Sequence, residues 1–155
     1  MTDTFEPANG DGSAVASTGR AAEVRTAFEG LLQIRRLTNT GTPDPAAVPA
    51  AWELNRMARA VALALEASGF PPSARDAEDR RTAMGYRVRE GERPRTVCVD
   101  WLGPAGSGAA PAEEAELTAC AAALAGLGWE ALLYRGPRKR RFLEVEPGGV
   151  SGTGT

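Results

Sequence analysis

The pattern of apolar and polar positions divides the chain into three helical stretches and four alternating ones. Val24, Phe28 and Leu31 recur at three- and four-residue intervals, which is typical of one face of an amphipathic helix. Residues 50–68 and 111–125 show the same spacing, and glycine follows each stretch. The pattern therefore predicts three helices, of which the first covers residues 19–38.

The alternating stretches predict two antiparallel hairpins. In residues 82–90 and 95–102, apolar side chains occupy every second position, as in a strand with one face on a core. Residues 129–135 and 140–146 repeat this alternation. Turn-forming residues join each pair, at 91–94 in the first hairpin and at 136–139 in the second.

Residues 52–102 and 113–146 share one plan, a helix followed by a hairpin. Each helix ends in a glycine–aromatic pair, and the first strand of each hairpin carries a Tyr-Arg pair, Tyr86-Arg87 and Tyr134-Arg135. This suggests an internal duplication and an α+β fold with the order α-β-β-α-β-β. We expect a four-stranded antiparallel sheet with two helices on one face, plus the N-terminal helix. This order resembles that of the type III secretion chaperone-like and related partner-binding folds, which implies partner binding.

Breaker residues set the expected boundaries. Residues 1–18 hold Asn9-Gly10-Asp11-Gly12-Ser13 and only Phe5 as a large apolar group, so we expect a disordered tail. A Gly- and Pro-rich linker at 39–48 precedes an α+β domain at 49–147, and a second disordered tail covers 148–155. The first helix either packs on its own core or docks on a partner or a second copy.

The composition excludes several kinds of chemistry. The chain of 155 residues has a net charge of −2 and no histidine, which excludes a Ser-His-Asp triad, a Cys-His pair and a Cys2His2 zinc site. The two cysteines, Cys98 and Cys120, cannot complete a zinc site alone. Lys139 is the only lysine, a bias typical of a GC-rich bacterial genome. No apolar leader or membrane span is visible, so we expect a cytoplasmic protein with reduced thiols and without metal or cofactor.

The second turn carries the strongest local signal. Arg135, Arg138, Lys139, Arg140 and Arg141 form a run without an acid, and Tyr134 and Phe142 border it. Such a hairpin can contact phosphates while its aromatic rings stack on bases. The arginines of the first hairpin, Arg87, Arg89, Arg93 and Arg95, extend this patch if the hairpins are adjacent, although Glu90 and Glu92 dilute it. A solvated turn explains the run equally.

Other motifs indicate no chemistry. The glycine loop before the helix at 111–125 lacks a Walker A lysine, and Glu113 and Glu114 occupy the first turn where an anion would sit. Asp100, Glu144 and Glu146 are expected to face solvent and pair with hairpin arginines. The tryptophans are typical core residues, but Trp101 or Trp129 would mark a binding face if exposed.

These observations favour a small non-catalytic interaction module, partner-binding and chaperone-like or regulatory. Its partner is expected to be another protein or a second copy of itself. The residues assigned to that contact are Val24, Phe28, Leu31, Trp101 and Trp129. The alternative is a nucleic-acid-binding protein that uses the basic hairpin, and an enzyme ranks third.

Overall fold

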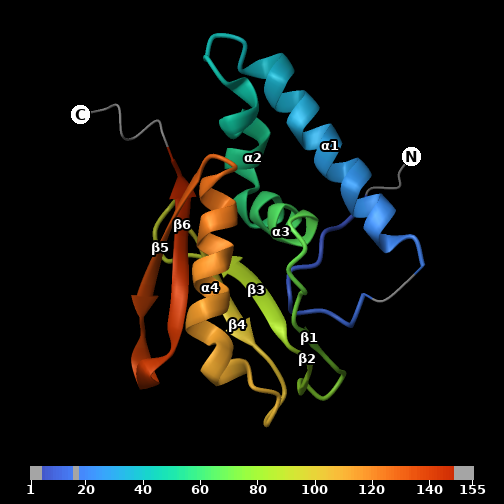
Figure 1. Cartoon of the computed structure of the whole chain (residues 1–155), viewed down its shortest axis with the longest axis vertical. Coiled ribbons are helices and arrows are strands. Elements are labelled where there is room, and N and C mark those ends of the chain that lie inside the picture. The colour runs from blue at the N-terminus through green and yellow to red at the C-terminus, as the bar shows by residue number, and fades with distance from the viewer. Residues whose placement is uncertain (1–4, 16–17, 149–155) are drawn as a thin grey trace.

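The computed structural model describes residues 5–15 and 18–148 (Figure 1). Its helices are α1 (Arg20–Thr38), α2 (Ala51–Asn55), α3 (Met57–Ala67) and α4 (Ala109–Ala125), with short 3-10 turns η1 (Pro45–Ala47) and η2 (Pro137–Lys139). Its strands are β1 (Ala74–Arg75), β2 (Arg81–Ala83), β3 (Gly85–Glu90), β4 (Val97–Leu102), β5 (Trp129–Arg135) and β6 (Arg141–Pro147). No helix within these residues is long and apolar enough to cross a membrane.

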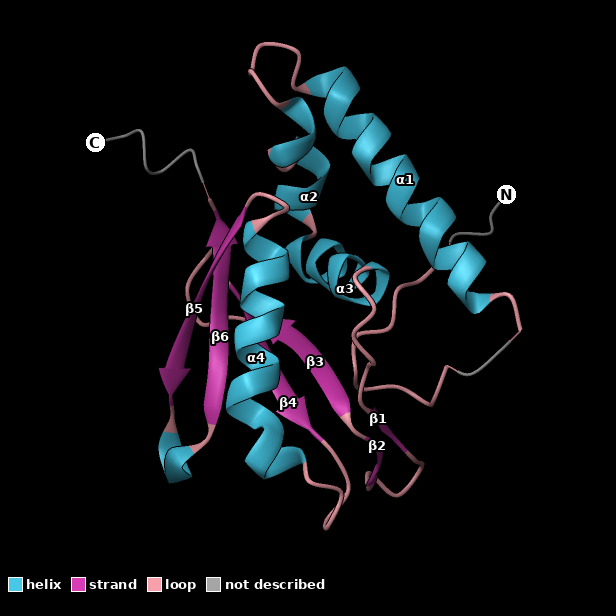
Figure 2. Ribbon diagram, in the orientation of Figure 1, coloured by secondary structure: helices cyan, strands magenta, loops and turns pink. Residues whose placement is uncertain are grey.

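Four strands form one antiparallel sheet in the order β3-β4-β6-β5, and α3 and α4 cover one of its faces (Figure 2). Val99 at the centre pairs with Val88 on one side and Leu143 on the other. These apolar positions face the helices and are buried with Leu117 and Leu124 of α4. The predicted α+β fold is confirmed.

The two hairpins are placed symmetrically in the sheet. Their second strands, β4 and β6, meet antiparallel at the centre, and their first strands, β3 and β5, lie at the edges. Each hairpin turn holds one arginine in the left-handed conformation, Arg95 with φ 63° and Arg138 with φ 60°. A duplicated helix–hairpin unit gives this arrangement, and it places the two turns at opposite ends of the sheet.

Helix α1 packs on its own chain rather than projecting away from it. Val24 and Leu31 are buried against Leu63 of α3, and together they form a second, smaller apolar cluster. The sequence leaves two alternatives open for this helix, and in the structure it packs on its own chain.

A buried ion pair locks α1 in place. Arg35 donates from Nε and Nη2 to the two carboxylate oxygens of Glu53 on α2, both at 2.8 Å, and both side chains are almost fully buried. Arg35 Nη1 also donates to the carbonyl oxygens of Ala46 and Leu127. Loss of the guanidinium would leave a buried carboxylate unpaired, which costs about 3–5 kcal/mol. The expected linker at 39–48 is therefore an ordered turn, fastened to α1 and to the loop before β5.

Residues 5–15 also differ from the expected disorder, because they pack along the outer edge of β3. The backbone N–H of Val88 donates to the Asn9 carbonyl at 2.8 Å, and the Tyr86 hydroxyl donates to the Ala8 carbonyl at 2.8 Å. Polar contacts hold residues 8–12 of this segment, while Phe5 at its start packs against the second apolar cluster. The remaining parts of the expected tails, residues 1–4, 16–17 and 149–155, lie outside the described residues.

Local breaks change three predicted elements. The helix expected over 50–68 is interrupted at Arg56, whose φ of −138° and ψ of 59° separate α2 from α3. The strand expected over 82–90 is divided at Met84, and its first part pairs with β1 in a small two-stranded sheet that the sequence did not predict. Helix α4 begins at Ala109, two residues earlier than expected.

A candidate binding groove on the open sheet face

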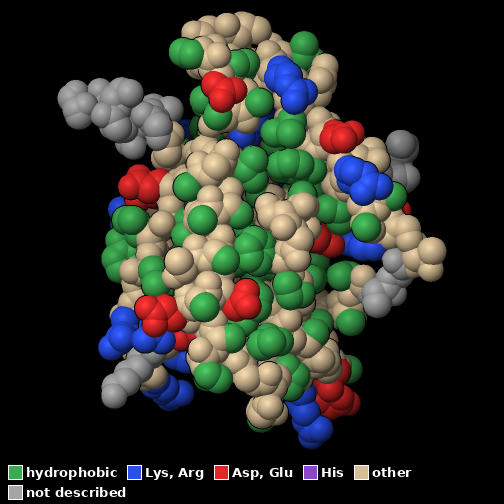
Figure 3. Space-filling view, viewed as in Figure 1, with side chains coloured by type: hydrophobic (Ala, Val, Ile, Leu, Met, Phe, Trp, Pro, Cys, Tyr) green, Lys and Arg blue, Asp and Glu red, His purple; other side chains and the backbone are tan. Residues whose placement is uncertain are grey.

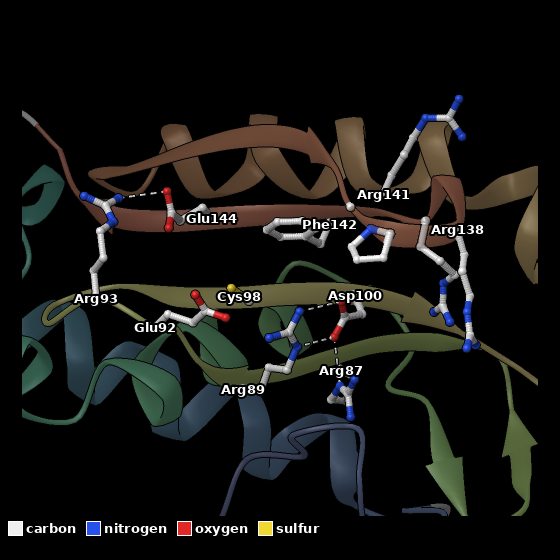
Figure 4. Close-up of a pocket in the computed structure, with 13 residues that line it drawn as sticks. Arg87, Arg89, Glu92, Arg93, Cys98, Asp100, Arg138, Arg141, Phe142 and Glu144 are labelled. Atoms are coloured by element: carbon white, nitrogen blue, oxygen red, sulfur yellow. Dashed lines mark hydrogen bonds and ion pairs between the residues drawn. The ribbon is translucent and has the colours of Figure 1, made fainter.

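The sheet face opposite the helices holds a groove that runs between the two hairpin turns (Figure 4). Its volume is about 660 Å³. Alternate residues of β3, β4 and β6 form its floor, and residues of both turns form its ends. The charged and aromatic side chains that line it are Arg87, Arg89, Glu92, Arg93, Asp100, Arg138, Arg140, Arg141, Phe142 and Glu144.

Two arginines converge on one carboxylate in the middle of the groove. Arg87 Nε and Arg89 Nε donate to Asp100 Oδ2 at 2.9 and 2.8 Å, and Arg89 Nη2 donates to Asp100 Oδ1 at 3.2 Å. The hydrogen bond to Asp100 raises the pKa of Arg89 more than burial lowers it. A second carboxylate, Asp11, lies 3.4 Å from Arg87 Nη1, so both guanidinium groups of the cluster have an acidic partner and keep only part of their donors free.

Aromatic rings continue the groove from this cluster towards β5. Phe142 stacks on Tyr134, its cross-strand neighbour, with ring centroids 5.9 Å apart and planes at 29°. The guanidinium of Arg89 lies over the Phe142 ring, with its central carbon 5.8 Å from the ring centroid. An arginine of β3, a phenyl ring of β6 and a phenol of β5 therefore span the width of the four-stranded sheet, as a polar–aromatic surface suited to extended ligands.

The two ends of the groove differ in how their arginines are paired. At the first turn, Arg93 Nη2 donates to Glu144 at 2.8 Å and lies 3.6 Å from Glu146. The expected pairing of strand carboxylates with hairpin arginines is therefore present. Asp100 differs from the expectation that it faces solvent, because Arg87 and Arg89 cover it and it is buried. At the second turn, Arg138 is exposed and has no ion-pair or hydrogen-bond partner among the described residues. Its charge is available to a ligand.

The other cations of the basic hairpin are divided between the sheet and α4. Arg140 and Arg141 lie 3.7 and 3.8 Å from the carboxylate of Glu113, which is almost fully buried, and Arg141 also lies 3.5 Å from Glu114. Arg135 is exposed at the end of β5, and Lys139 belongs to η2. The space-filling view shows cations gathered at this tip (Figure 3). The run predicted from the sequence is thus not one continuous free patch.

The residues assigned to a protein contact lie mainly in the core. Val24, Leu31, Trp101 and Trp129 are each at most 5% exposed, and Phe28 is half-buried between the two apolar clusters. In this fold the four buried side chains cannot provide a surface for a partner.

The two cysteines lie on opposite faces of the sheet, so they do not form a pair. Cys98 lines the groove beside Asp100, whereas Cys120 lies in the core under α4. Burial raises the pKa of both thiols, to about 12 for Cys120, which keeps them protonated near neutral pH. Within the described part of the chain, no three His, Cys, Asp or Glu side chains gather as metal ligands.

The Arg87–Arg89–Asp100 cluster was underestimated from the sequence. Of the two glutamates expected to dilute these arginines, Glu92 lines the groove, whereas Glu90 points to the helix side because side chains alternate along a strand. The two-residue period alone places Arg87 and Arg89 on one face, and it was the signal that could have found them.

No protein family, characterised protein or solved structure matches the chain.

Proposed function

We propose that the protein is a non-catalytic, cytoplasmic interaction module that binds an acidic, extended segment of a partner protein in the groove on its open sheet face. One observation carries this proposal: six arginines line the groove, and Arg138 among them has no ion-pair partner within the described residues, although the chain as a whole has a net charge of −2. A local positive surface on an acidic chain selects an oppositely charged partner.

The arginines keep hydrogen-bond donors free for such a partner. A guanidinium has five N–H donors, and Arg87 and Arg89 use only some of theirs on Asp100 and Asp11. Arg138 adds a third guanidinium at the end of the groove. Partner carboxylates can accept charge-assisted hydrogen bonds from these groups, while apolar partner side chains pack on Phe142 and Tyr134.

The backbone at Arg138 allows a test that separates binding from folding. A residue other than glycine in the left-handed conformation costs about 1 kcal/mol, and Arg138 adopts it with φ 60°. Glycine would be the more stable choice at this position. Arg95 in the first turn adopts the same conformation and does not line the groove, so this conformational cost belongs to both turns. It makes Arg138→Gly a substitution that removes the charge without loss of stability.

Fluorescence anisotropy with a labelled hexapeptide of alternating glutamate and leucine, at low and moderate salt, tests the proposal. We expect salt-dependent binding that weakens about fivefold or more in Arg138→Gly, which removes one charge and relieves the backbone strain. The matched control is Arg36→Gly or Arg36→Gln on α1, an exposed arginine far from the groove, and it should leave the affinity unchanged. Unfolding of Arg138→Gly in urea should show undiminished stability, which separates lost binding from lost folding.

A second candidate, single-stranded nucleic acid, is favoured by the Tyr134–Phe142 stack next to Arg138. Against it, Asp100, Glu92 and Glu144 lie in the same groove and repel a uniformly charged backbone, whereas a peptide can place neutral residues there. The same assay with labelled oligothymidine separates the two. Binding of the oligonucleotide but not the peptide would replace the proposal with this candidate, and binding of neither would reject both.

A further inference from the structure

We infer that the outer edge of β5 pairs antiparallel with β5 of a second copy, which joins two four-stranded sheets into one sheet of eight. This inference is independent of the groove and its ligand. It starts from exposure: five large apolar side chains of the described chain are exposed, and three of them, Leu132, Leu133 and Tyr134, are consecutive in β5. Apolar side chains follow the left margin of the space-filling view, where β5 lies (Figure 3).

These three side chains alternate between the two faces of the sheet, and all three are exposed, so β5 is uncovered on both faces. Leu132 and Tyr134 belong to the open face and Leu133 to the helix side, where it lies 38% exposed. Strand β5 pairs only with β6 among the described residues, in an unbroken register over seven residues. It carries no proline, lysine or bulge, which are the usual devices that keep an edge strand from pairing.

The strand is self-complementary when two copies run antiparallel. Its carboxylate, Glu130, lies near the start and its guanidinium, Arg135, at the end. Antiparallel pairing about Leu132 sets Glu130 of one copy opposite the phenol of Tyr134 of the other on the same face, while Arg135 lies on the other face. Parallel pairing in register would instead set like charges together. This complementarity favours a second copy over an unrelated strand.

A two-fold axis through Leu132 pairs all seven residues of both strands. Residues that face each other across antiparallel strands point to the same side. Leu132 then lies opposite Leu132 of the second copy, Leu133 opposite Ala131, and Tyr134 opposite Glu130, whose carboxylate can accept a hydrogen bond from the phenol. Because the axis is perpendicular to the sheet, both grooves remain open on the same face.

Light scattering coupled to size exclusion tests the association with the full chain. We expect wild-type protein to have twice the mass of one chain, Leu132→Lys to be monomeric, and Leu37→Lys on α1 to remain dimeric. Leu37 is the matched control because it is an equally apolar side chain that is 67% exposed on another surface. A monomeric wild type at high concentration would overturn the inference, as would a dimer that survives Leu132→Lys.

Cysteine crosslinking tests the register. A disulfide needs Cα atoms within about 7 Å, which holds for Leu132→Cys opposite itself across the axis. Glu130→Cys is the control, because two copies of residue 130 lie about four residues apart along the paired strands, or roughly 13 Å. Mild oxidation should crosslink the first variant and not the second, whereas a mixture of Glu130→Cys and Tyr134→Cys should crosslink. Failure of Leu132→Cys and of the mixture in a dimeric protein would overturn the antiparallel pairing.

Discussion

The two edges of the sheet are treated in opposite ways. The chain covers the edge at β3 with its own residues 8–12 and 71–73, which exchange backbone hydrogen bonds with Tyr86 and Val88. The edge at β5 has no such cover among the described residues and exposes Leu132, Leu133 and Tyr134. The two hairpins share one plan, so this difference arises from what the chain adds around them.

Residues 8–12 show that a polar segment can cover a sheet edge through backbone hydrogen bonds and ion pairs. Asp11 is its main anchor: it lies 2.6 Å from Arg81, 3.4 Å from Arg87 and 3.9 Å from Arg75. These contacts close the edge through charge. The bare edge at β5 keeps apolar surface instead, which is a surface for association.

The largest expected effect comes from forcing the cover off β3. A Cβ atom at Gly10, where φ is +90°, would overlap the Tyr86 carbonyl oxygen, so Gly10→Ala should lower the free energy of unfolding by about 2–3 kcal/mol. Hydrogen exchange should also accelerate at the Val88 amide, which donates to Asn9.

Gly19→Ala is the matched control for this change. Gly19 has a similar φ of +87° but no atom within 4 Å of the added carbon, so only the conformational cost of about 1 kcal/mol applies. Equal losses of stability in the two variants, with the Val88 amide still protected, would show that residues 8–12 do not cover the edge in solution.

A smaller loss is expected when the anchor is neutralised. Asp11→Asn removes charge-assisted hydrogen bonds to partly buried arginines and should cost about 1–2 kcal/mol in urea unfolding. Asp79→Asn, at an exposed carboxylate 3.5 Å from Arg75, should cost less than about 0.5 kcal/mol. If both substitutions cost the same, the Asp11 contacts do not fasten the segment.

Protonation of Asp11 at low pH should remove the stabilisation that its carboxylate provides, without a mutation. Burial raises the pKa of Asp11, but the hydrogen bond from Arg81 and the charges of Arg87, Arg81 and Arg75 outweigh this, and the net pKa is lowered from 3.8. The stabilisation is therefore complete above the unfolded-state pKa and is lost as the pH falls through the lower folded-state value. The stability difference between wild type and Asp11→Asn should stay constant down to about pH 5 and shrink below about pH 4. A difference that is unchanged at pH 3 would contradict this role.

The sequence predicts the interior of this fold better than its boundary. Periodicity located the helices and both hairpins, because burial of one face imposes it. It could not give the order β3-β4-β6-β5 or place residues 5–15, since these depend on contacts between distant residues such as Asp11 and Arg81. The Asn-Gly-Asp-Gly-Ser run indicated disorder by composition, yet its glycine allows close approach to β3 and its aspartate supplies the anchor.

The candidate site divides in the same way. The sequence predicts the basic hairpin as a run of cations. It does not predict which arginines are unpaired, because this depends on Glu113 of α4, which pairs with Arg140 and Arg141. Conversely, the predicted contacts at Trp101 and Trp129 are buried, because alternation places them on the helix side of their strands. A strand pattern gives the face of a residue, while a partner from another element decides whether its charge is available.

The smallest expected effect separates the two edges most directly. Leu132→Thr on bare β5 should change the free energy of unfolding of the dilute monomer by less than about 0.5 kcal/mol, because the side chain is already 43% exposed. The matched change on covered β3, Val88→Thr, places a hydroxyl in the core at 4% exposure and should cost about 1–3 kcal/mol. Urea unfolding at submicromolar protein measures both.

Because the inferred dimer buries Leu132, its substitution should become costly only as the protein concentration rises, while the cost at Val88 stays constant. A large, concentration-independent loss at Leu132 would mean that its own chain already covers β5, and the contrast between the edges would fail.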